Sequence, residues 1–300
     1  MASTVGKTEY LLLGLLAILW GSSYLFIKVA VAEIPPVTLI ALRVLGAAAF
    51  LMVVMRIRSE RLPTDMKTWR MLFVQALFNS IGAWTVLAWG QQFVDSGLAS
   101  VLNSTAPLFV ILITATVTRH EATGGLKLLG ALTGLVGVIL IVGPEVLNGL
   151  GAQVAGQLAC LLGALLYAGA AIYGKRLAHV GALATATGTM IWASAVLVPL
   201  AVLLDRPWAL LPTLSTQALA ATATLSILCT GVALLIYFRL LNTIGSLGVA
   251  SQAYLRAGVG VVLGLVVLGE TISVTAAIGL AAVMAGVILI NLRNKNRMSM

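Results

Sequence analysis

The residues that could do chemistry in this chain are polar and aromatic side chains that stand inside long apolar runs. They are Trp20, Tyr24, Asn79, Ser80, Trp84, Asn103, Tyr167, Gln252, Tyr254 and Arg256. A polar side chain at membrane depth is costly, so such residues usually face a bundle interior or a water-filled cavity. Aromatic rings suit flat or apolar ligands, and amides bind amino or carboxyl groups without net charge. The chemistry that this set predicts is substrate binding rather than bond breaking.

Each of these residues has an alternative role in packing. Interfacial belts account for most aromatic residues of membrane proteins, and polar side chains often join neighbouring helices. Two features favour a binding site. Trp20 and Tyr24 are four residues apart on one helix face, and Trp20 aligns with Tyr167 when the two halves of the chain are superposed. A pair of aromatic residues on opposite halves suits a site at the membrane midplane.

Three basic residues lie within the apolar runs. Arg256 is about nine residues, or about 13 Å, into its run. It either reaches the membrane surface with its long side chain or lines an aqueous cavity near a substrate carboxylate. Lys28 and Arg43 stand nearer the ends of their runs, so we expect them to reach the surface or to form ion pairs.

Acidic residues stand only at the ends of the apolar runs or between them. They are Glu9, Glu33, Glu60, Asp65, Asp95, Glu121, Glu145, Asp205 and Glu270. Because proton relays in membranes use carboxylates at depth, the sequence predicts facilitated transport, or coupling without a buried carboxylate. The chain also shows no nucleophile elbow, phosphate loop or metal-spaced His/Cys cluster. We therefore expect no enzyme, no metal and no cofactor.

The elements that must position these residues are membrane-spanning helices. The chain is 60% hydrophobic and 9% charged, with a mean hydropathy of +1.08, whereas soluble domains are about 25% charged. Continuous apolar runs favour helices over a barrel. We expect ten spans, over residues 10–31, 37–55, 69–90, 98–118, 125–142, 156–174, 183–204, 217–238, 247–268 and 272–292. The gaps are short, so we expect no ATPase domain in this chain.

The first run also resembles a signal peptide, with Lys7 before it and small residues at Ala30-Val-Ala32. The run is long for a signal core, and Lys28 precedes the cleavage-like site. We expect it to be retained as the first span.

Basic residues are distributed unevenly between the two sides of the predicted bundle. With ten spans, fourteen of the 18 Lys and Arg residues fall on the side of the N-terminus, one falls on the other side and three fall within spans. The positive-inside rule places the basic side, and both termini, in the cytoplasm. The net charge of +9 serves this topology and predicts no nucleic-acid partner.

An internal repeat divides the chain. The stretch Glu121 to Ile141 recurs 149 positions later as Glu270 to Ile290. The two copies have matching glycines, and each copy ends in the sequence Gly-Val-Ile-Leu-Ile. The sequence predicts an all-α membrane protein with ten transmembrane helices as two inverted five-helix repeats, residues 1–148 and 149–300, in one membrane domain. Five spans per repeat give the copies opposite orientations, a property of alternating-access carriers. Pro107 is a hinge candidate because it should kink the fourth span.

The chain resembles the drug/metabolite transporter superfamily, in its EamA-type ten-helix branch. The resemblance rests on Ala17-Ile-Leu-Trp-Gly-Ser-Ser23, on Ala99 through Ala106-Pro107, and on the Glu121 and Glu270 segments with the glycine-bearing spans after them. It covers essentially the whole chain and implies a carrier or exporter of small metabolites. One departure is Arg256, which stands where the second repeat of the family often has an acidic residue followed by proline.

The expected function is export of small metabolites across the inner membrane by alternating access. Similarity to the family's aromatic amino acid exporters makes aromatic or apolar amino acids the expected substrates. The alternative within the class is a broad-specificity exporter of metabolites, purines or drugs with ion coupling. A membrane enzyme would need clustered reactive groups, and a channel would need charged rings or a filter loop. The expected partners are a small-molecule substrate and the lipid bilayer, and no oligomer is required.

Overall fold

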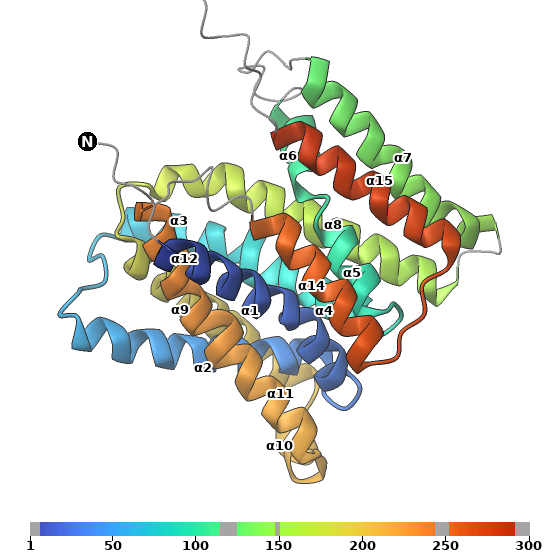
Figure 1. Ribbon diagram of the computed structural model, residues 1–300. Coiled ribbons are helices and arrows are strands. Elements are labelled where there is room, and N and C mark those ends of the chain that lie inside the picture. Colours follow the sequence, from blue (N-terminus) through green and yellow to red (C-terminus); the bar gives the residue numbers. More distant parts are fainter. Residues whose placement is uncertain (1–6, 115–124, 148–150, 244–251, 292–300) are drawn as a thin grey trace, which may run out of the picture.

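The computed structural model describes residues 7–114, 125–147, 151–243 and 252–291. Within these ranges the chain is helical and has no strands (Figure 1). The α-helices are α1 (Lys7–Val31), α2 (Pro36–Ile57), α3 (Met66–Ala76), α4 (Trp84–Gly90), α5 (Ser96–Asn103), α6 (Ala106–Ile113), α7 (Gly125–Leu147), α8 (Ala152–Gly174), α9 (Ala182–Leu204), α10 (Pro207–Leu210), α11 (Thr216–Ser226), α12 (Ala233–Thr243), α14 (Gln252–Val267) and α15 (Val274–Asn291). Two π-helices, η1 (Leu77–Ala83) and η5 (Ile227–Val232), and two 3₁₀ turns, η3 (Lys175–Leu177) and η4 (Leu211–Thr213), complete these ranges.

Helix starts follow familiar capping chemistry. The side chains of Asp65, Ser215 and Ser273 accept hydrogen bonds from backbone N–H groups three residues later. Pro36 opens α2 at a position where its missing N–H costs nothing. These starts agree closely with the predicted spans.

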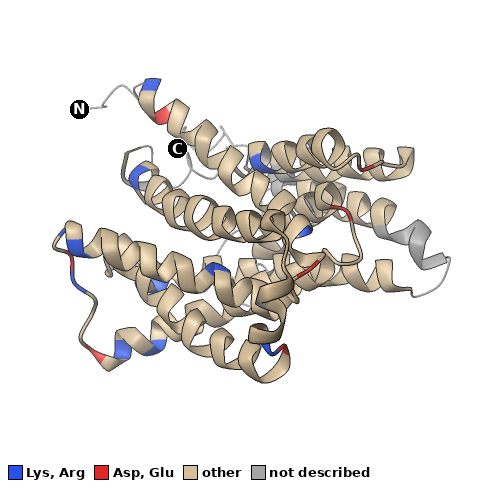
Figure 2. Cartoon of the chain, turned by 90° about the horizontal axis from the view of Figure 1, so that it is seen from below, with Lys and Arg blue, Asp and Glu red and all other residues tan. Residues whose placement is uncertain are grey.

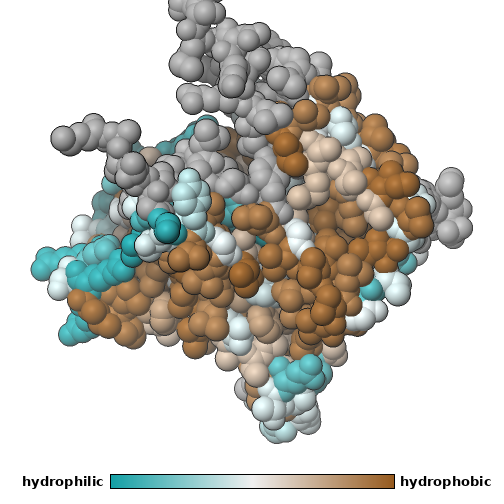
Figure 3. All heavy atoms as spheres, in the orientation of Figure 1, coloured by the Kyte–Doolittle hydropathy of each residue, from teal (hydrophilic) through white to brown (hydrophobic). Residues whose placement is uncertain are grey.

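Among the described residues, seven helical segments are long and apolar enough to cross a membrane: Lys7–Val31, Pro36–Ile57, Met66–Gly90, Ser96–Ile113, Ala152–Leu177, Ala182–Leu204 and Thr216–Leu240. Shorter apolar helices are Leu132–Ile141, Leu255–Val267 and Val274–Gly286. Large apolar side chains cover the outer surface, as the brown areas of Figure 3 show. Val266 and Val274 are each 77% exposed, which suits a hydrocarbon solvent and not water.

Two of the long segments contain a π-helical turn at corresponding places. The segment α3–η1–α4 has its π-turn at Leu77–Ala83, and the segment α11–η5–α12 has its π-turn at Ile227–Val232. In the second, the Thr230 hydroxyl donates to the carbonyl of Leu225, five residues earlier, at 2.8 Å. Such turns change the direction of the side chains that follow and are common at functional sites.

The fourth segment is interrupted. Helix α5 ends at Asn103, Ser104 and Thr105 form a turn, and α6 begins at Ala106. Pro107 lies in the first turn of α6, where its missing N–H is tolerated. The expected kink is therefore a full break between two helices. The break begins after Asn103, the last residue of α5, which lies four residues before Pro107.

Helices α7 and α15 contain the repeated stretch, and they pack against each other (Figure 1). A Cβ atom at Gly137 would lie 2.6 Å from the Gly279 carbonyl oxygen, and one at Gly286 would lie 2.5 Å from the Gly130 carbonyl oxygen. Only glycine allows this approach. Gly130 corresponds to Gly279 in the repeat, and Gly137 to Gly286, so the two helices meet through equivalent residues.

The two ends of the bundle differ in charge (Figure 2). We call the end that carries Glu33, Asp95, Asp205 and Glu270 the acidic end. We call the opposite end the basic end; it holds the end of α2, the start of α3 and the turn after α8, with Arg56, Arg58, Arg61, Lys67, Arg70, Lys175 and Arg176.

Carboxylates at the acidic end bind helix N-termini of other segments. Glu270 accepts from the N–H groups of Ser96 and Gly97 at 2.7 and 3.0 Å. Asp205 accepts from the N–H and hydroxyl of Thr38, and Glu33 accepts from Ser215. A negative charge at a helix N-terminus is favourable, so these acids serve to join helices.

Candidate functional site

Arg43 is the centre of a polar cluster inside the bundle. It lies about 10 Å along α2 from Pro36, and its side chain is 5% exposed. Its guanidinium carbon lies 3.8 Å from the centroid of the Trp84 ring, and its Nε donates to the Thr230 hydroxyl at 2.9 Å. A desolvated cation over a tryptophan face is stabilised by about 2 kcal/mol, which offsets part of the cost of burying the charge.

Trp84 and Tyr167 extend the cluster toward the second half of the chain. The indole N–H of Trp84, the first residue after the π-turn η1, donates to the hydroxyl of Tyr167 on α8. Helices α2, α4 and α8 and the π-turn η5 therefore place their polar groups near one another.

Tyr24 and Asn103 form the other side of the cluster. The Asn103 amide donates to the Tyr24 hydroxyl at 2.7 Å, and both side chains are buried. The carbonyl oxygen of the Asn103 side chain has no hydrogen-bond partner among the described residues, and the same holds for Nε of Arg256. Buried polar atoms nearly always have partners, so these two atoms are available to a polar partner.

The cluster holds positive charge that no acidic residue neutralises. The helices that form it carry no Asp or Glu except Glu9 in the first turn of α1. No carboxylate of the described residues lies within ion-pair distance of Arg43 or Arg256. Since arginine stays protonated in proteins, the cluster presents one buried cation, Arg43, and one half-buried cation, Arg256, to whatever binds there.

The other predicted site residues lie outside this contact network. Trp20 packs against Tyr237, with 5.3 Å between ring centroids, and does not meet Tyr167. Asn79 and Ser80 lie in η1, joined by a long contact of 3.5 Å. Gln252 is buried, and its side-chain carbonyl has no partner among the described residues. The side chain of Tyr254 lies outside the part of the chain that the structure describes.

Arg43 and Thr230 are the residues that the sequence reasoning missed. We expected Arg43 to reach the surface or to form an ion pair, and the structure shows instead that it is buried and stacked on Trp84. A partial signal was present: α2 contains no acidic residue with which Arg43 could pair within its own helix.

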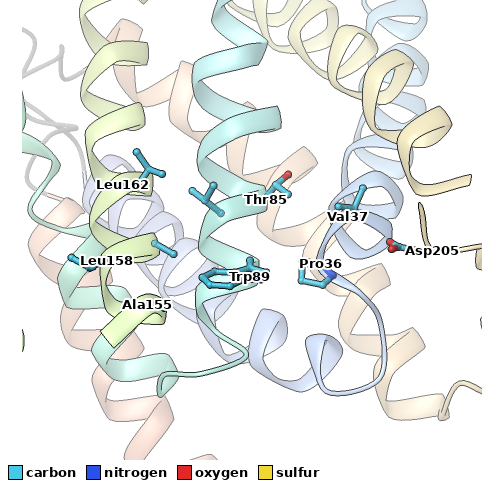
Figure 4. Close-up of a pocket in the computed structure, with 10 residues that line it drawn as sticks. Pro36, Val37, Thr85, Trp89, Ala155, Leu158, Leu162 and Asp205 are labelled. Carbon is cyan, nitrogen blue, oxygen red and sulfur yellow. The ribbon is translucent and has the colours of Figure 1, made fainter. Parts of the chain in front are cut away.

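A hollow lies between α2, α4 and α8, near the acidic end (Figure 4). Its volume is about 610 Å³, and Trp89 and Thr85 lie between Leu158 and Leu162 on one side and Pro36 on the other. Its lining is almost entirely apolar, and Asp205 at its edge is already bonded to Thr38. It therefore offers little to orient a polar ligand, and the Arg43 cluster remains the better site.

Comparison with known proteins identifies the class of this chain. The sequence model of the EamA-like transporter family matches residues 7–143 and again residues 154–292. The chain belongs to the EamA-like transporter family. This confirms the resemblance expected from the sequence.

Two curated relatives are also transporters by name. The chain is 28% identical to the uncharacterized inner membrane transporter YedA of Escherichia coli (strain K12) over 278 residues, 92% of this chain and 88% of YedA. It is 31% identical to the uncharacterized transporter YoaV of Bacillus subtilis (strain 168) over 166 residues, which span 55% of this chain and 56% of YoaV.

A solved crystal structure shares the fold, with a TM-score of 0.64 and 22% identity over 95% of this chain and 98% of its own. The family match and the long apolar helices together make this EamA-like transporter a multi-pass membrane protein.

Proposed function

We propose that this EamA-like transporter carries small metabolites with an aromatic or apolar group across the inner membrane by alternating access. Amino acids are the class expected from the sequence, with export as the direction. The observation that carries the proposal is the buried cluster of Arg43, Trp84, Tyr167, Tyr24 and Asn103. It combines ring faces with charged and amide groups, which is the composition of small-ligand sites.

The proposed architecture is ten spans in two inverted five-helix repeats, residues 1–148 and 149–300. Three observations support it: the family matches the chain twice, π-turns occur at equivalent places, and α7 meets α15 through equivalent glycines. Because Gly130 faces Gly286 and Gly137 faces Gly279, the equivalent helices run antiparallel. Antiparallel equivalents are what an axis in the membrane plane produces.

The proposed orientation has the basic end and both termini in the cytoplasm. We propose facilitated transport because the helices of the cluster carry no carboxylate near it. In a carrier without a titrating group at its binding site, the concentration gradient of the substrate sets the direction of net transport.

The test is counterflow of labelled phenylalanine and tryptophan into proteoliposomes, with and without a proton gradient. A panel of organic acids and amines is run beside them. We expect saturable uptake at the same rate with and without the proton gradient. Trp84→Ala should reduce this uptake at least about tenfold, because it removes the cation–π contact and the hydrogen bond of Trp84. The matched control is Trp208→Ala, at an exposed tryptophan of α10. Failure of every compound to enter would refute a carrier, and uptake only with the gradient would favour the ion-coupled alternative.

A further inference from the structure

We propose that the Arg43 cluster selects organic acids that carry a carboxylate and no ammonium group, in preference to zwitterions and amines. This inference rests on the proposed function and names the charge class of its substrate. It narrows the class expected from the sequence, because an ordinary amino acid carries both charges.

The first step of the argument is the geometry of the Arg43 guanidinium. One face is covered by the Trp84 ring, and Nε is bonded to Thr230. The two terminal nitrogens have no hydrogen-bond partner among the described residues. Stacking and the Thr230 bond hold the plane of the group while these donors stay free. A planar pair of N–H donors matches a carboxylate, which accepts two parallel hydrogen bonds.

The second step is the sign of the charge around it. Arg256 lies on α14, which packs against α1 and α5, the helices of Tyr24 and Asn103, so the helices of the cluster carry both Arg43 and Arg256. The helices of the cluster contain no acidic residue near them. An ammonium group placed there would meet like charge at low dielectric, where repulsion is strong. A carboxylate alone would meet only opposite charge.

The third step is the unpartnered acceptor. Asn103 is 1% exposed, and its side-chain carbonyl oxygen has no hydrogen-bond partner among the described residues. It accepts a hydrogen bond from a neutral hydroxyl as well as from an ammonium. A 2-hydroxy acid with an aromatic group satisfies all three features: its carboxylate meets Arg43, its hydroxyl meets Asn103 and its ring lies among Tyr24, Trp84 and Tyr167.

The experiment uses three ligands that share a benzyl group and differ in charge. They are 3-phenyllactate, an anion; phenylalanine, a zwitterion; and 2-phenylethylamine, a cation. Binding to the purified full chain is measured by calorimetry at pH 7, and counterflow is measured in proteoliposomes. We expect phenyllactate to bind and exchange at least about tenfold better than phenylalanine, because its carboxylate binds Arg43 and it brings no ammonium group near the two cations. The amine should be the weakest of the three.

The variants locate the selectivity. Arg43→Gln should lower phenyllactate affinity at least about tenfold and bring the ratio of phenyllactate to phenylalanine close to one. Arg43→Lys keeps the charge and loses the planar fork, so it should retain part of the preference. Thr230→Val should give a smaller loss of the same kind and serves if Arg43→Gln does not fold. Arg176→Gln, at the basic end beside Tyr173, is the control and should leave the ratio unchanged.

The outcomes separate this inference from the proposed function. Transport of phenylalanine or the amine at rates equal to phenyllactate overturns the inference and leaves a carrier. An anion preference that persists in both Arg43→Gln and Thr230→Val overturns the assignment to Arg43. Binding of none of the three ligands overturns the charge selectivity, while the broader panel decides separately whether the protein is a carrier.

Discussion

At the scale of single residues, the cluster depends on side chains that fix one another. Trp84 carries out two tasks at once, because its ring face stabilises Arg43 and its N–H donates to Tyr167. The Trp84–Tyr167 bond therefore sets the position of the surface on which the guanidinium lies. A buried hydrogen bond contributes about 1 kcal/mol, small for the fold but sufficient to hold one ring orientation.

A double-mutant cycle tests this pairing. Trp84→Phe and Tyr167→Phe each remove one partner and leave a ring, so each should destabilise the purified protein by about 1–3 kcal/mol through the unpaired group left behind. The double variant should cost less than the sum, with a coupling of about 1 kcal/mol, measured by reversible denaturation in detergent micelles. Phe78→Leu, at a ring near Tyr173 and outside the cluster, should add independently. Strict additivity of Trp84→Phe and Tyr167→Phe would show that the bond contributes nothing.

A second residue-scale prediction concerns pH and Asp95, which lies in the loop before α5. Burial raises the pKa of the Asp95 carboxyl above its usual 3.8, the nearby Glu270 raises it further, and Lys28 opposes the shift. The folded protein therefore binds more protons than the unfolded chain between the two pKa values, so this residue makes stability fall as pH rises from about 3.8 through the raised pKa.

Asp95→Asn removes that charge. The variant should melt above the parent at pH 7, and the difference should vanish as the pH is lowered below the usual pKa of an aspartate. Melting temperatures from about pH 3 to about pH 7 decide the matter. A variant that melts below the parent at pH 7 would mean that the Asp95 charge stabilises α5 more than its burial costs.

At the scale of elements, the packing of α7 on α15 depends on the absence of side chains. Their backbones approach so closely that a methyl group at Gly137 would lie within 2.6 Å of the Gly279 oxygen. No rotamer change relieves a clash between a Cβ atom and a backbone oxygen. The two helices must therefore shift apart whenever a larger residue replaces the glycine.

Gly137→Ala should consequently destabilise the protein by about 1–3 kcal/mol, the usual cost of overpacking. Gly14→Ala is the matched control, because it lies in α1 with no heavy atom within 4 Å of the added Cβ. The control should be neutral or stabilising, since alanine is the better helix former by about 1 kcal/mol. Equal effects of the two substitutions would show that the glycine contact is not tight.

The positions of helices were predictable from sequence, whereas of their interruptions only the one near Pro107 was. Apolar runs and caps located α1, α2, α8 and α9 to within a few residues, because the bilayer demands long apolar helices. The π-turn at Leu77–Ala83 and the break at Ser104 carry no such pattern. At the break, the hydroxyls of Ser104 and Thr105 donate to the carbonyls of Ser100 and Leu102, which are local contacts that the apolar pattern does not reveal.

The site was predictable only in part, for the same reason. Trp84, Tyr24, Asn103 and Tyr167 stood out as polar or aromatic residues at depth, and the structure brings them together. Arg43 did not, because its distance from the helix end does not measure its burial. Neighbouring helices cover Arg43 from the sides, and burial of that kind comes from packing rather than from position along one helix.

At the scale of the whole molecule, charge is sorted between two ends and kept from the helices between them, apart from Lys28, Arg43 and Arg256. Lys28 is occupied by the carbonyls of Gln91 and Val94, at 3.0 and 2.7 Å. Arg43 and Arg256 remain for the cluster. The proposed orientation of the bundle rests on this distribution of charge, and the proposed preference for anionic substrates rests on the two arginines.

The orientation leads to a prediction about accessibility from each side of the membrane. Thr213, in η4 at the acidic end, and Glu60, between α2 and α3 at the basic end, are both exposed. The native Cys160 and Cys229 are buried, so a new surface thiol should dominate labelling by a membrane-impermeant maleimide. Because basic segments remain in the cytoplasm, Thr213→Cys should be labelled in intact cells and Glu60→Cys only in inside-out vesicles. The unsubstituted chain is the control and should show little labelling in either preparation. The reverse pattern would invert the orientation, and labelling of both sites from one side would contradict a bundle whose acidic and basic ends face opposite compartments.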